Sequence, residues 1–316
     1  MTAPTRTSLV PPRLVSLPVE RAQLEYSSRA LVFSSDGDRL LRAWGPPERP
    51  WVLSVEAARD RWAIEAWGAG PAAARSAVRS LFSLDHPIEQ FYRRTREEPV
   101  LRGTERRFRG LRLPRDANLY EALVHTIVGQ QISVAAANAI KGRLIERFGG
   151  VLRAGRLTVP CLPPPSRLRR EGVEGLRSVG LSAAKSRSLV ALASAGSRSL
   201  PSVARLRSSP LPEARAVLER LPGVGRWTAE NALLRGAGRT DVFVAGDLGL
   251  RHALDRYGVV PRGASEESAR AWGERWYPGW GSYATLYLWR ALVADRAGSD
   301  RDVGGAVPSR TAESVR

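Results

Sequence analysis

The segment LERLPGVGRWTAENALLRGAGRTDVFVAGDLGLRHAL, residues 218–254, contains two helical stretches joined by a short glycine-rich turn. The turn holds Gly223 and Gly225, and glycine permits backbone conformations and close approaches that other residues resist. Two helices that meet at such a turn can direct bare backbone N–H groups at a phosphate. The same pattern also fits an ordinary connection between helices, so the turn alone leaves both interpretations open.

A single carboxylate, Asp247, follows this turn twenty residues after Trp227. A carboxylate placed beside a sugar can stabilise the positive charge that builds up when a glycosidic bond breaks. Asp is also a favoured N-cap, so Asp247 could instead begin a helix over residues 248–257. Asp241 is the nearest other acid, and it better suits a structural turn.

The chain of 316 residues is long enough that two domains are expected. Its formal net charge is +18, from 49 basic and 31 acidic residues. A GC-rich genome accounts for the use of Arg over Lys, but not for this excess, so we expect a nucleic-acid partner. Residues 151–210 hold eleven basic and two acidic residues, a net charge of +9, as expected if one face meets phosphates.

The residue inventory excludes several classes of protein. One cysteine, Cys161, excludes a disulfide framework and any zinc site or cluster built on four cysteines. The three histidines lie too far apart in sequence for a local metal motif, so no metal held by side chains is expected. The sequence has no apolar run of eighteen residues, and prolines interrupt its N-terminal segment. We therefore expect a soluble, cytoplasmic, nucleoid-associated protein without membrane contact.

Residues 1–110 are predicted to form an α+β domain with an antiparallel sheet. Short apolar segments are separated by turn residues, of which Ser35–Asp38 is a hairpin signal, and a helix is expected over residues 72–82. The expected strands contain residues 31–33, 40–41, 51–53 and 62–64. Four tryptophans are expected to lie in the core of this domain: Trp44, Trp51, Trp62 and Trp67.

Residues 111–297 are predicted to form an all-helical core. Asn118 and Glu121 fit a capping box, and the apolar residues that follow share one helical face. The expected helices begin near residue 118 and cover about 133–148, 172–195, 212–220 and 283–294, with a loop from Pro160 to Pro165. Residues 298–316 are polar and aperiodic, so this tail is expected to be disordered.

LPGVGRWTA followed by DVFVAGD resembles the helix–hairpin–helix GPD superfamily of DNA glycosylases. Within it, the closest branch is 3-methyladenine DNA glycosylase II, whose members remove alkylated purines. GLRLPRDANLYEALVHTIVGQQISV resembles the first core helices of that branch, LRSVGLSAAKSRSLVALA its middle helices and ERWYPGWGSYATLYLW its terminal segment. The likeness covers about residues 110–295. It implies a helical glycosylase core behind an N-terminal sheet domain, acting on damaged double-stranded DNA in base excision repair.

The resemblance implies roles for the residues of the quoted segment. Asp247 is the catalytic residue, and Trp227 and Trp289 line the base pocket, where indole faces attract a cationic alkylated purine. Plain core packing remains the alternative for both tryptophans. Asn231 stands where the best-matching relatives carry tyrosine, so the pocket is expected to be wider or more polar. Activity on a deaminated or oxidised base therefore stays open.

The hairpin that binds the DNA phosphates comprises Gly223, Val224, Gly225 and Arg226 by this resemblance. Gln131 matches the position of the wedge that fills the space left by the flipped base, although Gln130 and Gln131 could merely cap two helices. The resemblance also implies a Na⁺ or K⁺ ion on the carbonyls of Leu221 and Val224. No other cofactor is implied, and the missing cysteines argue against an iron–sulfur cluster.

Relatives that also cut the DNA strand carry a lysine at or near the position of Trp227, because its amine forms a Schiff base with the sugar. The two lysines of this chain, Lys141 and Lys185, lie far from the hairpin in sequence. The expectation is therefore a monofunctional, monomeric glycosylase that leaves an abasic site and has no lyase activity. The alternative from another class is a homologue that binds DNA structures without catalysis.

Overall fold

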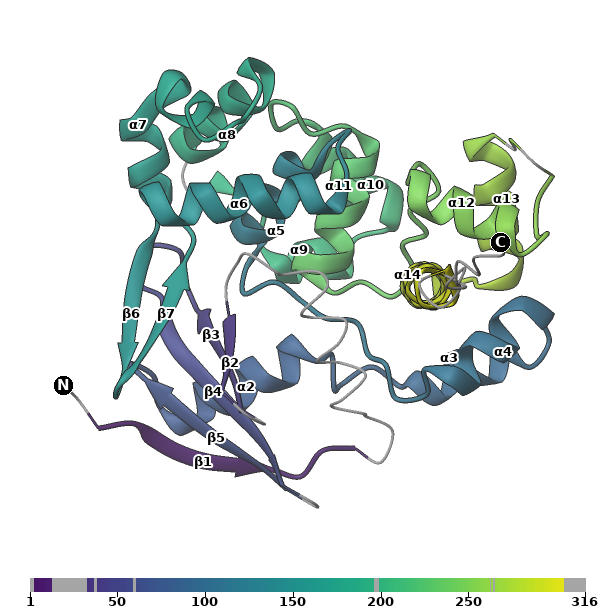
Figure 1. Cartoon of the computed structure of the whole chain (residues 1–316), viewed down its shortest axis with the longest axis horizontal. Helices are drawn as coiled ribbons and strands as arrows, with labels where there is room; N and C mark the ends of the chain where they lie inside the picture. The colour runs from purple at the N-terminus through teal and green to yellow at the C-terminus, as the bar shows by residue number, and fades with distance from the viewer. Residues whose placement is uncertain are drawn as a thin grey trace, which may run out of the picture.

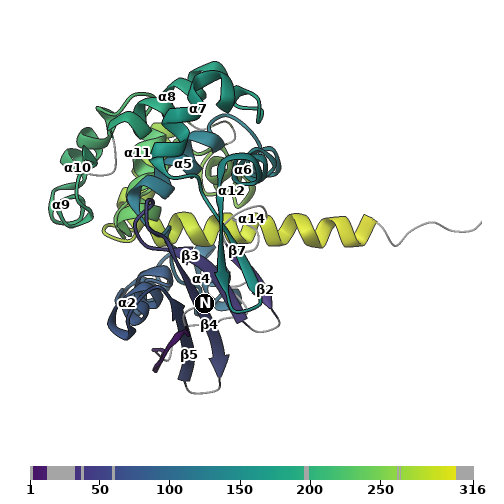
Figure 2. The same cartoon turned by 90° about the vertical axis from the view of Figure 1, so that its left-hand side faces the viewer.

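The computed structural model describes residues 3–12, 33–36, 39–58, 61–195, 199–261, 263 and 265–303. The N-terminal strands form a sheet layer, and most of the remaining chain forms a helical body beside it (Figure 1). Helix α14 (Gly281–Val303) is seen end-on in Figure 1 and from the side in Figure 2. The predicted fold class, an antiparallel sheet followed by a mainly helical core, is confirmed.

The sheet has five antiparallel strands in the order β1-β5-β4-β3-β2. The strands are β1 (Thr5–Leu9), β2 (Phe33–Asp36), β3 (Arg39–Trp44), β4 (Trp51–Ala58) and β5 (Arg61–Trp67). The predicted hairpin is confirmed, because β2 pairs with β3 and places Asp36 opposite Arg39. Leu31 and Val32, which were expected to begin its first strand, lie outside the described residues.

Helix α2 (Pro71–Leu81) covers one face of the sheet and confirms the helix expected there. Proline suits its first turn, where a backbone N–H has no partner within the helix. Its buried side chains pack into a core that contains Trp44 and Trp62, which are 8% and 3% exposed. Trp51 and Trp67 are partly buried against the two cores. The prediction of a core position is therefore confirmed for Trp44 and Trp62, while Trp51 and Trp67 only pack against the cores.

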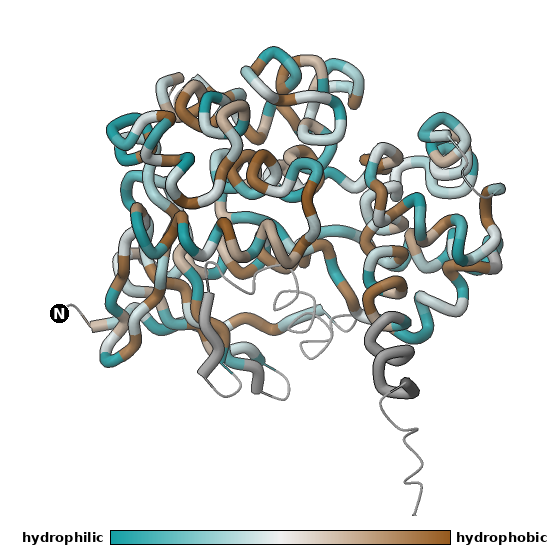
Figure 3. The backbone as a smooth tube through the Cα atoms, turned by 45° about the horizontal axis from the view of Figure 1, so that its top comes forward, coloured by the Kyte–Doolittle hydropathy of each residue, from teal (hydrophilic) through white to brown (hydrophobic). Residues whose placement is uncertain are grey.

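A larger core lies between the sheet and the helices and includes Leu41 and Val52 from the strands. Helices α3 (Ile88–Thr95) and α4 (Pro99–Arg107) contribute to the same core, and α4 contacts α14. One hydrophobic core therefore extends across residue 110, the boundary predicted between the domains. Along the helices, hydrophobic bands alternate with hydrophilic ones, as expected of amphipathic helices (Figure 3).

The helical body contains α5 (Leu119–Gly129), α6 (Val134–Phe148), α7 (Pro165–Arg177), α8 (Ala183–Ala195), α9 (Val203–Ser208), α10 (Leu211–Glu219), α11 (Arg226–Ala232), the π-helical turn η2 (Leu233–Ala237), α12 (Leu248–Arg256), α13 (Glu266–Trp276) and α14. Half of the predicted capping box is formed, because Asn118 Oδ1 accepts a hydrogen bond from the Glu121 N–H at 2.9 Å. The other half is not formed, because the Glu121 carboxylate pairs with Arg42 of β3.

Two predictions for this part of the chain were wrong, and the helical prediction for residues 172–195 was confirmed with different bounds. Strands β6 (Gly150–Ala154) and β7 (Leu157–Cys161) form a hairpin that packs on the sheet, so the body is not all-helical and Pro160 lies in a strand (Figure 1). The region 172–195 contains parts of two helices, the first of which is broken at Gly172. Residues 298–303 continue α14, while residues 304–316 lie outside the described part of the chain.

Within the described residues, no helix is long and apolar enough to cross a membrane.

Candidate active site

The predicted hairpin lies between α10 and α11, where the chain turns at Gly223 and restarts as a helix after Gly225. Gly223 has φ +76°, and the Val224 N–H donates to the Leu221 carbonyl at 3.1 Å. Val224 is buried beneath the turn, whereas both glycines are exposed. A carbonyl oxygen can accept two bonds, so the Leu221 oxygen that faces Val224 still has a lone pair for a monovalent cation.

The loop after α5 lies directly beside this hairpin. The Gln130 amide donates to the Gly223 carbonyl at 2.9 Å and to the Thr228 hydroxyl at 2.9 Å. Gln131 follows with φ +56° and an exposed side chain that makes no hydrogen bond to any described residue. Ser133 caps α6 instead. The proposed wedge residue is therefore beside the hairpin and free to contact a ligand, and helix capping does not explain its side chain.

Asp247 is the residue on which the helices of the site converge. Its Oδ2 accepts a hydrogen bond from Trp227 Nε1 at 3.0 Å, and its Oδ1 accepts one from Trp289 Nε1 at 2.9 Å. The same Oδ1 accepts the Leu250 N–H at 2.8 Å and so caps α12. Asp247 is partly exposed, so it is accessible and is not a fully buried charge. Both interpretations of its position, N-cap and site residue, fit the same geometry.

The N-terminal part of α14 holds the segment that leads to Asp247. The Val242 N–H donates to the Ser282 hydroxyl at 3.2 Å, and the Val244 N–H donates to the Thr285 hydroxyl at 3.3 Å. Trp289 follows Thr285 by about one helical turn and reaches Asp247 itself. Helix α14 therefore fixes both the backbone that carries the carboxylate and one of the donors that orient it. No motif in the sequence predicted these two hydroxyl contacts.

Two other residues named from the sequence, Asn231 and Asp241, make no hydrogen bond to this carboxylate in the described part of the chain. Asn231 is buried on α11, and its amide donates to the Trp227 carbonyl at 2.9 Å, so its role in a pocket stays a prediction. Asp241 pairs with Arg239, which donates to backbone carbonyls of the α9–α10 connection. Asp241 thus has the structural role expected of it. Arg226 pairs with Glu230 on its own helix.

Lys185 lies closer to the hairpin in space than its sequence position indicated. Its ammonium donates to the Val128 carbonyl at 2.9 Å and to the Gln130 carbonyl at 2.7 Å, at the end of α5. Distance in sequence was therefore the wrong argument for excluding Lys185 as the amine that forms a Schiff base. The Lys185 amine is engaged with two carbonyls at the end of α5.

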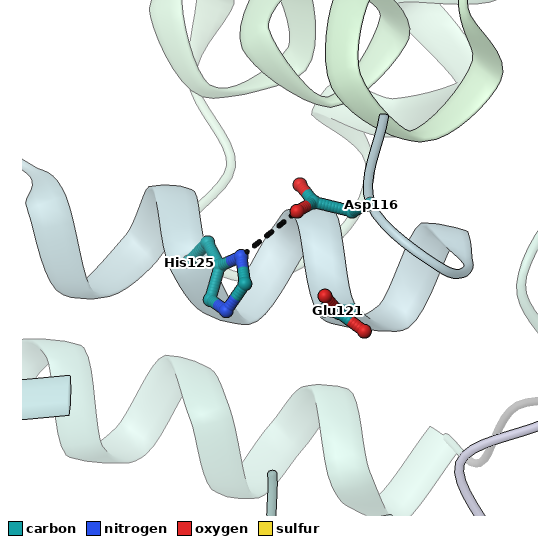
Figure 4. A group of neighbouring side chains, drawn as sticks. All are labelled: Asp116, Glu121 and His125. Atoms are coloured by element: carbon teal, nitrogen blue, oxygen red, sulfur yellow. Dashed lines mark hydrogen bonds and ion pairs between the residues drawn. The ribbon is translucent and has the colours of Figure 1, made fainter. Parts of the chain in front are cut away.

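A second group of titratable side chains was not singled out from the sequence. Asp116, Glu121 and His125 are buried, and one ligand atom from each lies within 4.8 Å of the others (Figure 4). Asp116 is 3.0 Å from Arg235 Nε and 3.6 Å from Arg42 Nη2, and Arg42 also pairs with Glu121. Guanidinium groups therefore already neutralise the carboxylates that a metal ion would need. The group is an ion-pair network joining the sheet to the helical body.

Burial and mutual charge shift the pKa values of this network. Burial alone would raise the pKa of the Asp116 carboxyl, but Arg235, His125 and Arg42 hold it well below its ordinary value. Burial raises the pKa of Glu121 to about 7 and lowers the pKa of His125 to about 4. The folded state therefore favours a neutral His125 beside an ionised Asp116.

Protonation of histidine is expected to make the fold sensitive to acid. Burial, followed by nearby arginines, lowers the pKa of His86 to about 4, as burial does for His125. A histidine in the unfolded chain binds its proton near pH 6.5. Each buried histidine therefore lowers the unfolding free energy of the protein as the pH falls from about 6.5 to 4. His86→Gln and His125→Gln should each reduce the slope of unfolding free energy against pH by up to about 1.4 kcal/mol per unit.

Urea unfolding at pH 4.5, 5.5 and 6.5 measures this slope. The variants are each compared with the unmodified chain, because Glu121, with its raised pKa, acts in the opposite direction between about pH 4.5 and 7. Equal slopes in the variants and the unmodified chain would contradict the assignment of neutral, buried histidines.

Several known proteins are similar to this chain in sequence or in fold. A family model described as HhH-GPD superfamily base excision DNA repair protein matches residues 124–278. The DNA-3-methyladenine glycosylase of Bacillus subtilis is 29% identical over 215 residues, which cover 68% of this chain and 71% of that protein. DNA-3-methyladenine glycosylase 1 of Schizosaccharomyces pombe is 30% identical over 174 residues, covering 54% of this chain and 71% of that protein.

A solved structure shows the same fold over nearly the whole chain. The 3-methyladenine DNA-glycosylase from Archaeoglobus fulgidus matches with a TM-score of 0.78 at 24% identity, covering 92% of this chain and 98% of that one. The matched family segment contains the hairpin, Trp227 and Asp247, while Trp289 follows it on α14. The chain therefore belongs to the HhH-GPD superfamily of base excision DNA repair proteins and is related to the 3-methyladenine DNA glycosylases.

Proposed function

We propose that this protein is a monofunctional DNA glycosylase that flips alkylated purines of the 3-methyladenine type out of duplex DNA and hydrolyses their glycosidic bond. The observation that carries the proposal is the Asp247 carboxylate, which two indole N–H groups orient beside the hairpin helix. The names of the Bacillus and Schizosaccharomyces relatives point to the same substrate class.

One carboxylate is sufficient for this chemistry. Breaking the bond between C1′ and the base builds positive charge on the sugar, and a nearby carboxylate stabilises that charge and can orient the attacking water. An alkylated purine is itself cationic, so it leaves as a neutral base without a separate general acid. A neutral damaged base would need such an acid, which favours the alkylated class.

The remaining parts of the site support binding and base flipping. Gln130 hydrogen-bonds to the hairpin and so places its neighbour Gln131 beside it. A wedge at Gln131 and a phosphate grip, meaning the phosphate-binding hairpin, can therefore contact the same stretch of duplex. Lys185 uses its amine on carbonyls of α5, which supports hydrolysis without strand cleavage. We also propose that the protein acts as a monomer and binds no cofactor through its side chains.

A base-release assay on duplexes with a single lesion tests the proposal. The substrates carry a methylated purine, hypoxanthine, uracil or 8-oxoguanine, and release of base is scored separately from strand cleavage. We expect release from the methylated duplex, followed by strand cleavage only after alkali. Release of a deaminated or oxidised base alone would favour a related glycosylase. Tight binding without release from any duplex would favour a non-catalytic homologue.

The two hairpin glycines are expected to respond differently to substitution by alanine. A Cβ at Gly223 would lie 1.9 Å from Ser188 Oγ, on a backbone with φ +76°, whereas a Cβ at Gly225 meets no atom within 4 Å. Gly223→Ala should therefore lower the unfolding free energy by on the order of 1–3 kcal/mol and also weaken DNA binding.

Gly225→Ala is the matched control, because it should leave stability unchanged and weaken only the approach of the phosphate. Thermal unfolding and fluorescence anisotropy with an undamaged duplex measure the two effects. Since phosphate contacts read no sequence, the loss of affinity should be the same for different duplex sequences. Unchanged affinity in both variants would show that the hairpin is not the phosphate grip.

A further inference from the structure

A polar cleft of about 510 Å³ lies between the connection from α2 to α3 and the loop that follows η2. Four arginines line it, and two carboxylates stand among them. The arginines are Arg79, Arg115, Arg207 and Arg239, and the carboxylates are Asp85 and Asp241. The cleft therefore carries an excess of positive charge.

Each carboxylate is already paired with one arginine. Asp85 pairs with Arg79, and Asp241 accepts from Arg239 Nε at 2.8 Å. Arg115 and Arg207 make no ion pair with a carboxylate anywhere in the described ranges of the chain. Two guanidinium groups thus line the cleft without a direct ion pair, and the charge of Asp85 acts on both from a longer distance.

Arg115 is fixed in place although its charge is not neutralised. It is 8% exposed, and its Nη2 donates to the Gly236 carbonyl at 2.9 Å. Its Nε is buried and has no hydrogen-bond partner among the described residues. A Cβ at Gly238 would lie 2.5 Å from this Nε, so the guanidinium rests directly on the backbone of the loop.

Arg207 adds a second cation at the same place. Its Nε donates to the Ala237 carbonyl at 2.6 Å, which holds the side chain against the loop that also supports Arg115. Burial, and then the charge of Arg207, lowers the pKa of Arg115 to about 10. A buried cation beside a like charge is costly unless an anion binds to both.

We propose that this cleft is a second anion site, which binds a phosphate group between Arg115 and Arg207. Guanidinium groups present planar sets of donors that match phosphate oxygens, and the volume suits a ligand of nucleotide size. The cleft lies at the opposite end of the α11–η2 segment from the hairpin, so it is not the grip described above. The same phosphate chemistry is offered by a free polyphosphate and by the end of a nucleic-acid strand.

Isothermal titration of the full chain with pyrophosphate, in the absence of DNA and at constant ionic strength, tests the site. We expect saturable binding, with about tenfold or greater weakening in Arg207→Gln, which removes one charged donor. Arg205→Gln is the matched control on the same helix, because Arg205 is exposed, as Arg207 is, but does not line the cleft. Asp85→Asn should tighten binding, and a misfolded variant cannot produce that gain.

Competition then identifies the source of the phosphate. Displacement of pyrophosphate by a 5′-phosphorylated trinucleotide, but not by the same trinucleotide without phosphate, assigns the cleft to strand ends. Failure of both to displace it assigns the cleft to a free polyphosphate. The site is disproved if the unmodified chain does not bind, if Arg207→Gln binds equally well, or if sodium chloride reproduces the heat. Asp247→Asn should bind pyrophosphate normally, so the result is independent of the proposed glycosylase activity.

Discussion

Asp247→Asn is expected to retain duplex binding and to lose base release by a factor of at least about 10²–10³. The substitution removes the negative charge that would stabilise the sugar cation. It preserves the cap of α12, because asparagine is as good an N-cap as aspartate and its Oδ1 can still accept the Leu250 N–H. Single-turnover release from a methylated duplex measures the loss of activity.

The structure also suggests a control that separates the charge from its orientation. Trp289→Phe removes the indole N–H that donates to Asp247 Oδ1 but keeps an aromatic ring and the carboxylate. We expect a smaller loss of activity than in Asp247→Asn, since Trp227 still orients the other oxygen. If Asp247→Asn releases base at the rate of the unmodified chain, Asp247 is not the catalytic residue. Anisotropy with the same duplex excludes loss of binding as the cause.

Asp116→Asn is expected to lower the unfolding free energy by about 3–5 kcal/mol, the largest stability effect that we predict. The Asp116 carboxylate is 97% buried and faces Arg42, Arg235 and His125. The substitution leaves the buried Arg42 and the partly buried Arg235 with one carboxylate, Glu121, whose own pKa is raised to about 7 by burial. Urea unfolding at pH 7 measures the loss.

The matched control is an exposed ion pair. Glu174 and Arg177 pair on the surface of α7, with 82% and 52% of their side chains exposed, and Glu174→Gln should cost less than about 1 kcal/mol. A loss in Asp116→Asn as small as in this control would mean that the network is not important for stability. The network joins β3 to the helical body, so its loss should also loosen the sheet.

Several features of the fold follow from local sequence alone. Asn118 caps α5, β2 pairs with β3 on either side of the predicted hairpin signal, and Gly223 has the positive φ that a tight turn requires. These features depend on residues within a few positions of one another, where hydrogen bonds and steric limits act directly. The hairpin between α10 and α11 belongs to the same class.

Other features depend on contacts between distant parts of the chain. The sequence did not predict strands β6 and β7, and the loop expected from Pro160 to Pro165 overlaps only the end of β7; the hairpin is stabilised by packing on the sheet. Arg42 and Glu121 are 79 residues apart in sequence, so no local pattern predicts their ion pair. Glu121 and His125 are one helical turn apart on α5, and this spacing alone is only a weak indication of a buried network. Asp116 becomes a structural acid because Arg235 approaches it from η2.

In the candidate site, some features follow from sequence motifs and others only from tertiary contacts. The sequence and its family resemblance predicted Asp247, the hairpin glycines, Gln131 and the two tryptophans as site residues, and the structure brings Asp247 together with both tryptophans. The sequence did not predict that the indole N–H groups of Trp227 and Trp289 donate to Asp247. The packing of both α11 and α14 around the segment before α12 decides this, since these contacts depend on how the helices meet and not on residue spacing.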